Sequence, residues 1–236
     1  MKIQRFFLVI LLALLTDTAA FAQRKVITPE AHFGLSLNVD ANGLHAGRYK
    51  ESRVESGPAF SFALAALMHI GEPSDLLNLS IGCGYRGLFD QTPPHEFVEN
   101  PSYSDYSLYV KSHNWRDEGS EVRPLGGLIV FPFELHLNIL PLGETSSLFI
   151  GSGVEYGLRL YQPNRYARYF GANVMNRACL SVSPEIGITF GDDDDDVQID
   201  LSLYLRHYVY NCFNTKDLPI GKFSHNYLGL QAAITL

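Results

Sequence analysis

The chain has 236 residues, of which 46% are hydrophobic and 18% charged, and its formal net charge at pH 7 is -7. The acidic balance argues against a nucleic-acid partner, and the small share of charge is unusual for an exported soluble domain. No run of about 18 apolar residues follows the N-terminal region, so a helical membrane protein is excluded.

The first residues have the pattern of a secretory signal peptide. Two basic residues precede an apolar core at 6–15, and Ala-Phe-Ala at 20–22 is a small-x-small cleavage signature. No cysteine follows the core, so an N-terminal lipid anchor is not indicated. We expect residues 1–22 to be a signal peptide and residues 23–236 to be one exported domain.

From residue 32 onward, the chain alternates between bulky apolar residues and small or polar ones. A period of two residues is typical of a β-strand with two unlike faces. In the first such segment Phe33, Leu35 and Leu37 oppose Gly34 and Ser36. The alternation predicts eight strands, in chain order 32–40, 59–70, 77–89, 129–139, 148–160, 180–190, 197–209 and 228–236.

The connections between these strands alternate in length. Short turns are expected at 71–75, 141–146 and 191–196, and long polar loops at 42–55, 91–122, 163–176 and 213–223. The second of these loops is long enough to hold a further hairpin around 106–110. Short turns at one end and long loops at the other are typical of outer-membrane barrels, which have an even number of strands.

The composition of the polar face indicates which side of the wall points outward. Within the strands this face is mostly Gly, Ser, Ala and Asn, with no lysine and few charges. A water-facing surface would carry many lysines and glutamates, whereas small residues suit the crowded interior of a small barrel. We therefore predict an all-β, eight-stranded antiparallel up-and-down transmembrane barrel whose bulky face contacts lipid. A soluble lipocalin-like periplasmic carrier, with its faces reversed, is the alternative.

Two stretches carry a resemblance beyond the general pattern: LIVFPFELHLNILPLG at 128–143 and the closing segment HNYLGLQAAITL at 225–236. With them, the chain resembles the small eight-stranded outer-membrane barrels of bacteria, of the OmpX-like and PorT-like kind, over essentially the whole mature length. The first stretch looks like the fourth strand and turn of PorT-like barrels. The resemblance implies an integral protein of the bacterial outer membrane, with both termini at the periplasmic side.

Two prolines, Pro132 and Pro184, fall inside predicted strands. A proline lacks the backbone donor that the strand ladder needs, so we expect a β-bulge at each position.

The three cysteines, Cys83, Cys179 and Cys212, permit at most one internal disulfide. Cys179 and Cys212 fall near loop ends on neighbouring predicted strands, which makes them the conceivable pair. Counted from the turn between those strands, the two cysteines are offset by several residues. A disulfide needs a short Cα–Cα separation, so this spacing argues against the bridge.

Charged residues on the inward face form the first candidate site. Buried charges are tolerated when they are paired, so we predict a layered ion-pair network that fills the barrel. Its carboxylates are expected nearer the short turns and its arginines nearer the long loops. A proton or ion path is the alternative role. The predicted network consists of Arg86, Glu134, Glu155, Arg159, Glu185, Asp200 and Arg206.

Basic residues in two long loops form the second candidate site. They are Arg48, Lys50 and Arg53 in the first loop and Arg165 and Arg168 in the third. We expect these side chains to complement the phosphates of lipopolysaccharide or to contact an envelope or extracellular partner.

Neither a metal site nor a catalytic site is predicted. The aspartates at 192–196 lack the Gly and distal Glu of a calcium loop, so they indicate a solvated turn. None of the eight histidines has a serine two residues on, which a His-x-Ser lipid-modifying barrel enzyme would show. The expected role is therefore structural or surface-interacting, and a lipid-modifying enzyme is the alternative. We expect the protein to be a monomer and to bind no cofactor. A wide pore is disfavoured because aqueous channels need about 16 strands.

Overall fold

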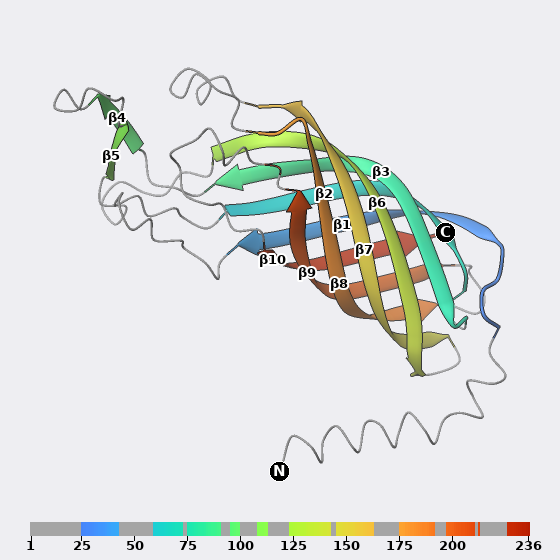
Figure 1. Ribbon diagram of the computed structural model, residues 1–236. Coiled ribbons are helices and arrows are strands. Elements are labelled where there is room, and N and C mark those ends of the chain that lie inside the picture. The colour runs from blue at the N-terminus through green and yellow to red at the C-terminus, as the bar shows by residue number, and fades with distance from the viewer. Residues whose placement is uncertain are drawn as a thin grey trace, which may run out of the picture.

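Eight strands close into one antiparallel barrel (Figure 1). The structure, a computed structural model, describes residues 25–42, 59–72, 75–90, 95–99, 108–112, 123–142, 145–162, 175–191, 197–210, 212 and 226–236. The predicted signal peptide at 1–22 and the aspartates at 192–196 lie outside these ranges. So do the predicted loop contacts Arg48, Lys50, Arg53, Arg165 and Arg168.

The barrel strands coincide with the eight predicted segments, so the predicted all-β fold with its closed eight-stranded antiparallel barrel is confirmed. The one large difference in bounds is β6, which begins at Arg123 and not at residue 129. The strands are β1 (Ala31–Asn42), β2 (Ala59–Ile70), β3 (Leu77–Asp90), β6 (Arg123–Pro141), β7 (Ser146–Tyr161), β8 (Ala178–Gly191), β9 (Gln198–Tyr210) and β10 (Asn226–Thr235). A separate two-stranded sheet, β4 (His95–Glu99) with β5 (Leu108–Ser112), supplies the further hairpin expected between β3 and β6.

Each barrel strand has two antiparallel neighbours, in the order β1, β10, β9, β8, β7, β6, β3, β2 and back to β1. The first and last strands form the closing seam, where Leu37 lies opposite Ala232. Beyond the strand end, the backbone N–H of Leu236 donates to the Phe33 carbonyl at 2.8 Å. None of these eight strands is left with a free edge, so the backbone of the wall satisfies its own hydrogen bonds.

The two faces of the wall differ as the alternation predicted. Phe33, Leu35 and Leu37 on β1 are at least half exposed on the outside, whereas Ser36 and Asn38 between and beside them are buried inside. The same alternation of exposed and buried residues continues along β7, β8, β9 and β10. Bulky apolar side chains therefore cover the outside, and most of the small and polar side chains of the strands face the interior.

Pro132 and Pro184 do not cause the bulges predicted for them. Pro132 lies opposite Glu155 and Pro184 opposite Ser152, both in regular register. The pairing of β3 with β6 and of β8 with β9 skips these prolines and resumes in the same register. A local gap in one ladder accommodates each missing donor, and the register shifts occur nearer the strand ends, for example after Gly127.

The short-turn end of the barrel, where β2 meets β3, binds the segment that precedes β1. The backbone N–H of Leu76 donates to the Lys25 carbonyl at 2.9 Å. The backbone N–H of Leu77, the first residue of β3, donates to the Val26 carbonyl, also at 2.9 Å. Asp75, which is buried, accepts from the backbone N–H of Thr28 at 2.6 Å and from its hydroxyl at 3.1 Å. It also accepts from the Glu72 N–H at 3.0 Å. The Asp75 carboxylate thus ties Thr28, in the segment before β1, to the turn between β2 and β3.

We expect Asp75→Ala to release this segment and to lower the free energy of unfolding by about 1–3 kcal/mol, because two backbone donors lose a charged acceptor. The measurement is hydrogen exchange of the Thr28 amide, which should become much faster. Thr28→Val is the matched control, since it removes the hydroxyl bond and keeps the stronger backbone bond. Unchanged exchange of Thr28 in Asp75→Ala would show that the carboxylate does not hold the segment.

Candidate functional site

The alternation along four strands places charged side chains together inside the barrel. Asp40 on β1, Arg86 on β3, Glu155 on β7 and Arg206 on β9 form mutual ion pairs. These four residues, with Tyr204 of β9, are called the central cluster below. All five are buried, and Arg86 is 0% exposed. Charges at such depth are tolerated because each has an opposite partner.

Arg86 links β3 to three other strands. Its Nε and Nη2 donate to the two oxygens of Glu155, both at 2.8 Å. This two-point contact matches the planar guanidinium to the planar carboxylate. Its Nη1 donates to Asp40 at 3.1 Å and to the Ser61 hydroxyl at 2.7 Å. A single side chain therefore joins β1, β2, β3 and β7 across the interior.

Arg206 approaches the same two carboxylates. Its Nε donates to Asp40 at 2.9 Å, and its Nη1 lies 2.7 Å from Glu155. Asp40 also accepts from the Tyr204 hydroxyl at 2.9 Å and from the Ser61 hydroxyl. Two arginines thus face two carboxylates, and the central cluster has no net charge.

A second group of carboxylates has neutral partners in place of arginine. Glu134 accepts two hydrogen bonds from the Gln231 amide, at 3.1 and 3.0 Å. Glu185 accepts from the Ser202 hydroxyl at 3.0 Å and lies 3.1 Å from Nε2 of His136. Within the described part of the chain, neither carboxylate forms an ion pair with an arginine.

Asp200 continues this second group on β9. It accepts from the Thr189 hydroxyl at 2.7 Å and from the Gln198 amide at 3.0 and 3.1 Å. The same amide lies 3.3 Å from Nε2 of His69, whose Nδ1 is 2.8 Å from the Ser80 hydroxyl. His69 and Ser80 are 1% and 3% exposed, so this histidine–serine pair presents almost no surface to lipid or solvent.

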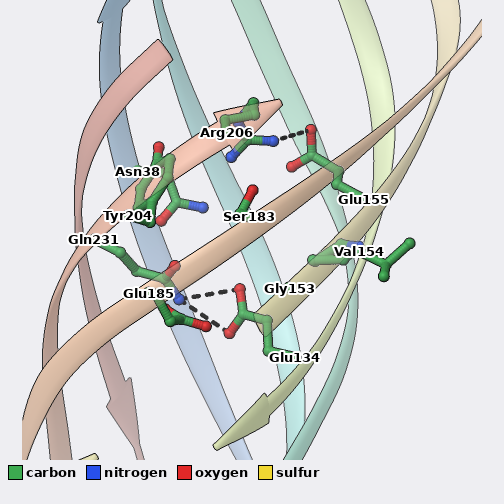
Figure 2. A pocket seen from close by; sticks show the side chains of 11 residues that line it. Asn38, Glu134, Gly153, Val154, Glu155, Ser183, Glu185, Tyr204, Arg206 and Gln231 are labelled. Carbon is green, nitrogen blue, oxygen red and sulfur yellow. Dashed lines mark hydrogen bonds and ion pairs between the residues drawn. The ribbon is translucent and has the colours of Figure 1, made fainter. Parts of the chain in front are cut away.

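A cavity of about 20 Å³ lies between the central cluster and the second group. Figure 2 shows Arg206 and Glu155 toward one side of it and Glu134 and Gln231 toward the other. Its volume is enough for about one water molecule. Asn38 also lines it, and Asn38 Oδ1 is a buried acceptor without a partner among the described residues. The cavity is too small for an organic ligand.

Toward the long loops, the interior becomes apolar and aromatic. Tyr208 and Tyr227 pack edge to face with ring centroids 5.7 Å apart. Met175 is held there by Arg159, whose Nη1 donates to the Met175 carbonyl at 2.6 Å, and by Gln162 Oε1, which accepts from the Met175 N–H at 3.1 Å. The buried members of this layer are Leu88, Leu128, Val130, Met175, Cys179, Tyr208, Cys212 and Tyr227.

The structure changes the membership of the predicted network. Arg86, Glu155 and Arg206 are ion-paired. The other three predicted carboxylates are held by neutral donors and His136. Arg159 does not belong to either group of charged residues. It lies at the long-loop end, where its guanidinium donates to the Met175 carbonyl.

Sequence reasoning missed Asp40 and Tyr204 as members of the central cluster. Both occupy inward positions of predicted strands, so the alternation was a usable signal. It does not indicate which strands approach one another across a closed barrel, and that approach makes Asp40 the partner of both arginines.

The outer surface is the second feature that bears on function. We call its exposed apolar side chains the apolar belt. No exposed residue described on the eight barrel strands is Asp, Glu, Lys or Arg, and the exposed polar ones are Ser152, His207 and Asn226. Members of the belt on successive strands include Phe33, Leu35, Leu37, Val39, Phe62, Leu64, Ile81, Phe131, Phe133, Ile150, Val154, Leu158, Ile186, Phe190, Leu201, Leu203, Leu205, Leu228 and Leu230.

Aromatic rings gather on the outer face toward the long loops. Phe89 stacks on Phe60 and on Phe62, with ring centroids 5.2 and 5.5 Å apart. The Tyr85 and Tyr161 hydroxyls lie 3.5 Å apart on the same side of the barrel. Aromatic girdles of this kind flank the lipid-facing band of outer-membrane barrels.

In the described ranges, no set of three or more His, Cys, Asp or Glu side chains could hold a metal ion. The same ranges contain no helix with the length and hydropathy needed to cross a membrane. A scan against models of protein families and a search of curated proteins both find no match.

Proposed function

We propose that this chain is an integral β-barrel protein of the bacterial outer membrane, with a structural or surface-interaction role. The apolar belt carries the proposal. Soluble proteins rarely expose contiguous apolar surface beyond a few hundred Å², whereas here exposed apolar side chains occur on all eight barrel strands. A bilayer is the environment in which a closed wall with such an outer surface is stable.

The polar interior favours a membrane barrel over a soluble carrier. A lipocalin-like carrier keeps its apolar residues inside, around an apolar ligand. In this chain the central cluster and the second group of carboxylates fill the middle of the barrel. The cavity between them, at about 20 Å³, leaves no room for such a ligand.

The same filling argues against a wide pore. Eight strands enclose a space that side chains can occupy completely, and Arg86, Tyr204 and Phe149 are among the largest buried side chains. We therefore assign interactions to the loops and propose contact with lipopolysaccharide phosphates or with an envelope or extracellular partner. The outer-membrane location is supported by the resemblance to OmpX-like and PorT-like barrels and by the predicted signal peptide. The proposed contact residues are Arg48, Lys50, Arg53, Arg165 and Arg168.

The histidine–serine pair of His69 and Ser80 is the feature closest to a lipid-modifying enzyme. A nucleophile that attacks a lipid must be open to the acyl group. Both side chains are buried inside the barrel, so we propose a non-enzymatic role.

The test is fractionation of cells that export the chain, followed by gel electrophoresis of the detergent-extracted membranes with and without boiling. We expect the protein in the outer membrane and a band that shifts on boiling, because a closed barrel resists unfolding by detergent at low temperature. A protein that is released in periplasmic buffer and runs identically under both conditions would contradict the proposal.

A further inference from the structure

Cys179 and Cys212 meet inside the barrel at its long-loop end. Cys179 lies at the start of β8, Cys212 follows the end of β9, and Leu180 lies opposite Tyr210. The backbone N–H of Asn176 donates to the Cys212 carbonyl at 2.8 Å. The Cys179 side chain lies close enough to the Cys212 thiol to raise its pKa, and each of the two side chains is at most 1% exposed.

All three cysteines are free thiols in the structure, in line with the spacing argument, but the structure brings the Cys179 and Cys212 side chains together despite their offset from the turn. Val182 lies opposite His207, whereas Leu180 lies opposite Tyr210. The one-residue shift is a β-bulge, and it changes how the chain after β9 runs beside the start of β8. Counting residues from the turn between the strands could not reveal this, because the bulge lies at the far end of the hairpin.

We propose that Cys179 and Cys212 form a disulfide bond in the exported protein. The inference rests on the proposed function, since a chain bound for the outer membrane passes through an oxidising compartment. Cys83 is not a competing partner, because it is exposed on the outer face of β3 while the other two are buried inside.

The bond forms by exchange with an oxidant that carries a disulfide, such as an oxidised dithiol protein of the periplasm. The thiolate of one cysteine attacks the oxidant and forms a mixed disulfide. The thiolate of the second cysteine then attacks the first cysteine's sulfur and displaces the remaining sulfur of the oxidant. Two electrons pass to the oxidant, which leaves as a dithiol with the two protons given up by the cysteines.

The exchange is expected before the barrel closes. Burial and the neighbouring Cys179 raise the pKa of the Cys212 thiol well above its usual range in the folded chain. The thiolate is the reactive form, so a buried, protonated thiol reacts slowly. Once formed, the disulfide is shielded from reductants by the same burial, and it ties β8 to the chain after β9 beside Tyr208 and Tyr227.

Counting thiols in the full exported protein tests the proposal against the simpler reading that two free cysteines pack as small apolar side chains. Cells are quenched with acid, the protein is dissolved in denaturing detergent, and a maleimide carrying a polyethylene glycol chain labels free thiols with and without prior reduction. We expect one labelled thiol before reduction and three after it. Three labelled thiols before reduction would overturn the disulfide.

Two variants identify the partners. Cys83→Ser should show no labelled thiol before reduction and two after it. Cys179→Ala should show two labelled thiols under both conditions, since Cys212 loses its partner; no labelled thiol before reduction would mean that Cys212 pairs with Cys83 and would overturn the assignment. Three free thiols in a heat-shifting outer-membrane protein refute the disulfide alone, whereas a disulfide in a protein outside the membrane refutes the proposed function alone.

Discussion

Leu203→Arg should lower the free energy of unfolding in lipid vesicles by about 2–4 kcal/mol. Leu203 lies near the middle of β9 and is 45% exposed as part of the apolar belt. In the proposed membrane the new guanidinium would stand at mid-depth in the hydrocarbon, where its hydration is lost. Unfolding of the vesicle-inserted protein by guanidinium chloride, monitored by far-ultraviolet circular dichroism, measures the change.

Val209→Arg is the matched control on the same strand and the same face. Val209 lies near the long-loop end of β9, where an arginine can reach the headgroups, so we expect a loss of about 0–1 kcal/mol. On a water-exposed surface both substitutions would change stability by only about 0.5 kcal/mol. Equal and small effects at the two positions would therefore count against a lipid-facing belt.

Arg86→Met should lower the free energy of unfolding by about 3–5 kcal/mol, the usual effect of removing one partner from a buried ion pair. The substitution leaves Asp40 and Glu155 with Arg206 as their one remaining cation in the central cluster. It also removes the bond from Arg86 to Ser61. Chemical denaturation in detergent micelles measures the loss.

Arg159→Met is the control, because Arg159 is only partly buried and its described partners are neutral. We expect it to cost about 1–2 kcal/mol. The double variant Arg86→Met with Glu155→Gln restores equal numbers of arginines and carboxylates, and should recover part of the stability that Arg86→Met loses. A double-mutant cycle measures this coupling; a coupling of zero would show that Arg86 does not act through Glu155.

Local pattern was sufficient for the strands. From Phe33 to Val39 in β1 and from Ile199 to Leu205 in β9, every second residue is bulky and apolar. A pleated strand turns successive side chains to opposite faces whatever its neighbours are. The alternation therefore predicted both the strands and their outward faces. Pro132 was misjudged by the same local reasoning, since its missing donor is accommodated by a gap in one ladder while the neighbouring pairs keep their register.

By itself, the sequence determined that this chain forms eight strands with one bulky and one polar face. Successive side chains of a strand point to opposite faces, so an alternating sequence is enough to define both faces. Only the tertiary structure decided which inward groups meet. Asp40 and Arg206 are far apart in sequence, yet both belong to the central cluster because β1 and β9 are brought together by closure of the barrel through β10. The contact between Cys179 and Cys212 likewise depends on a bulge in the pairing of β8 with β9. Closure and register are set jointly by all eight strands, so no single segment encodes these contacts.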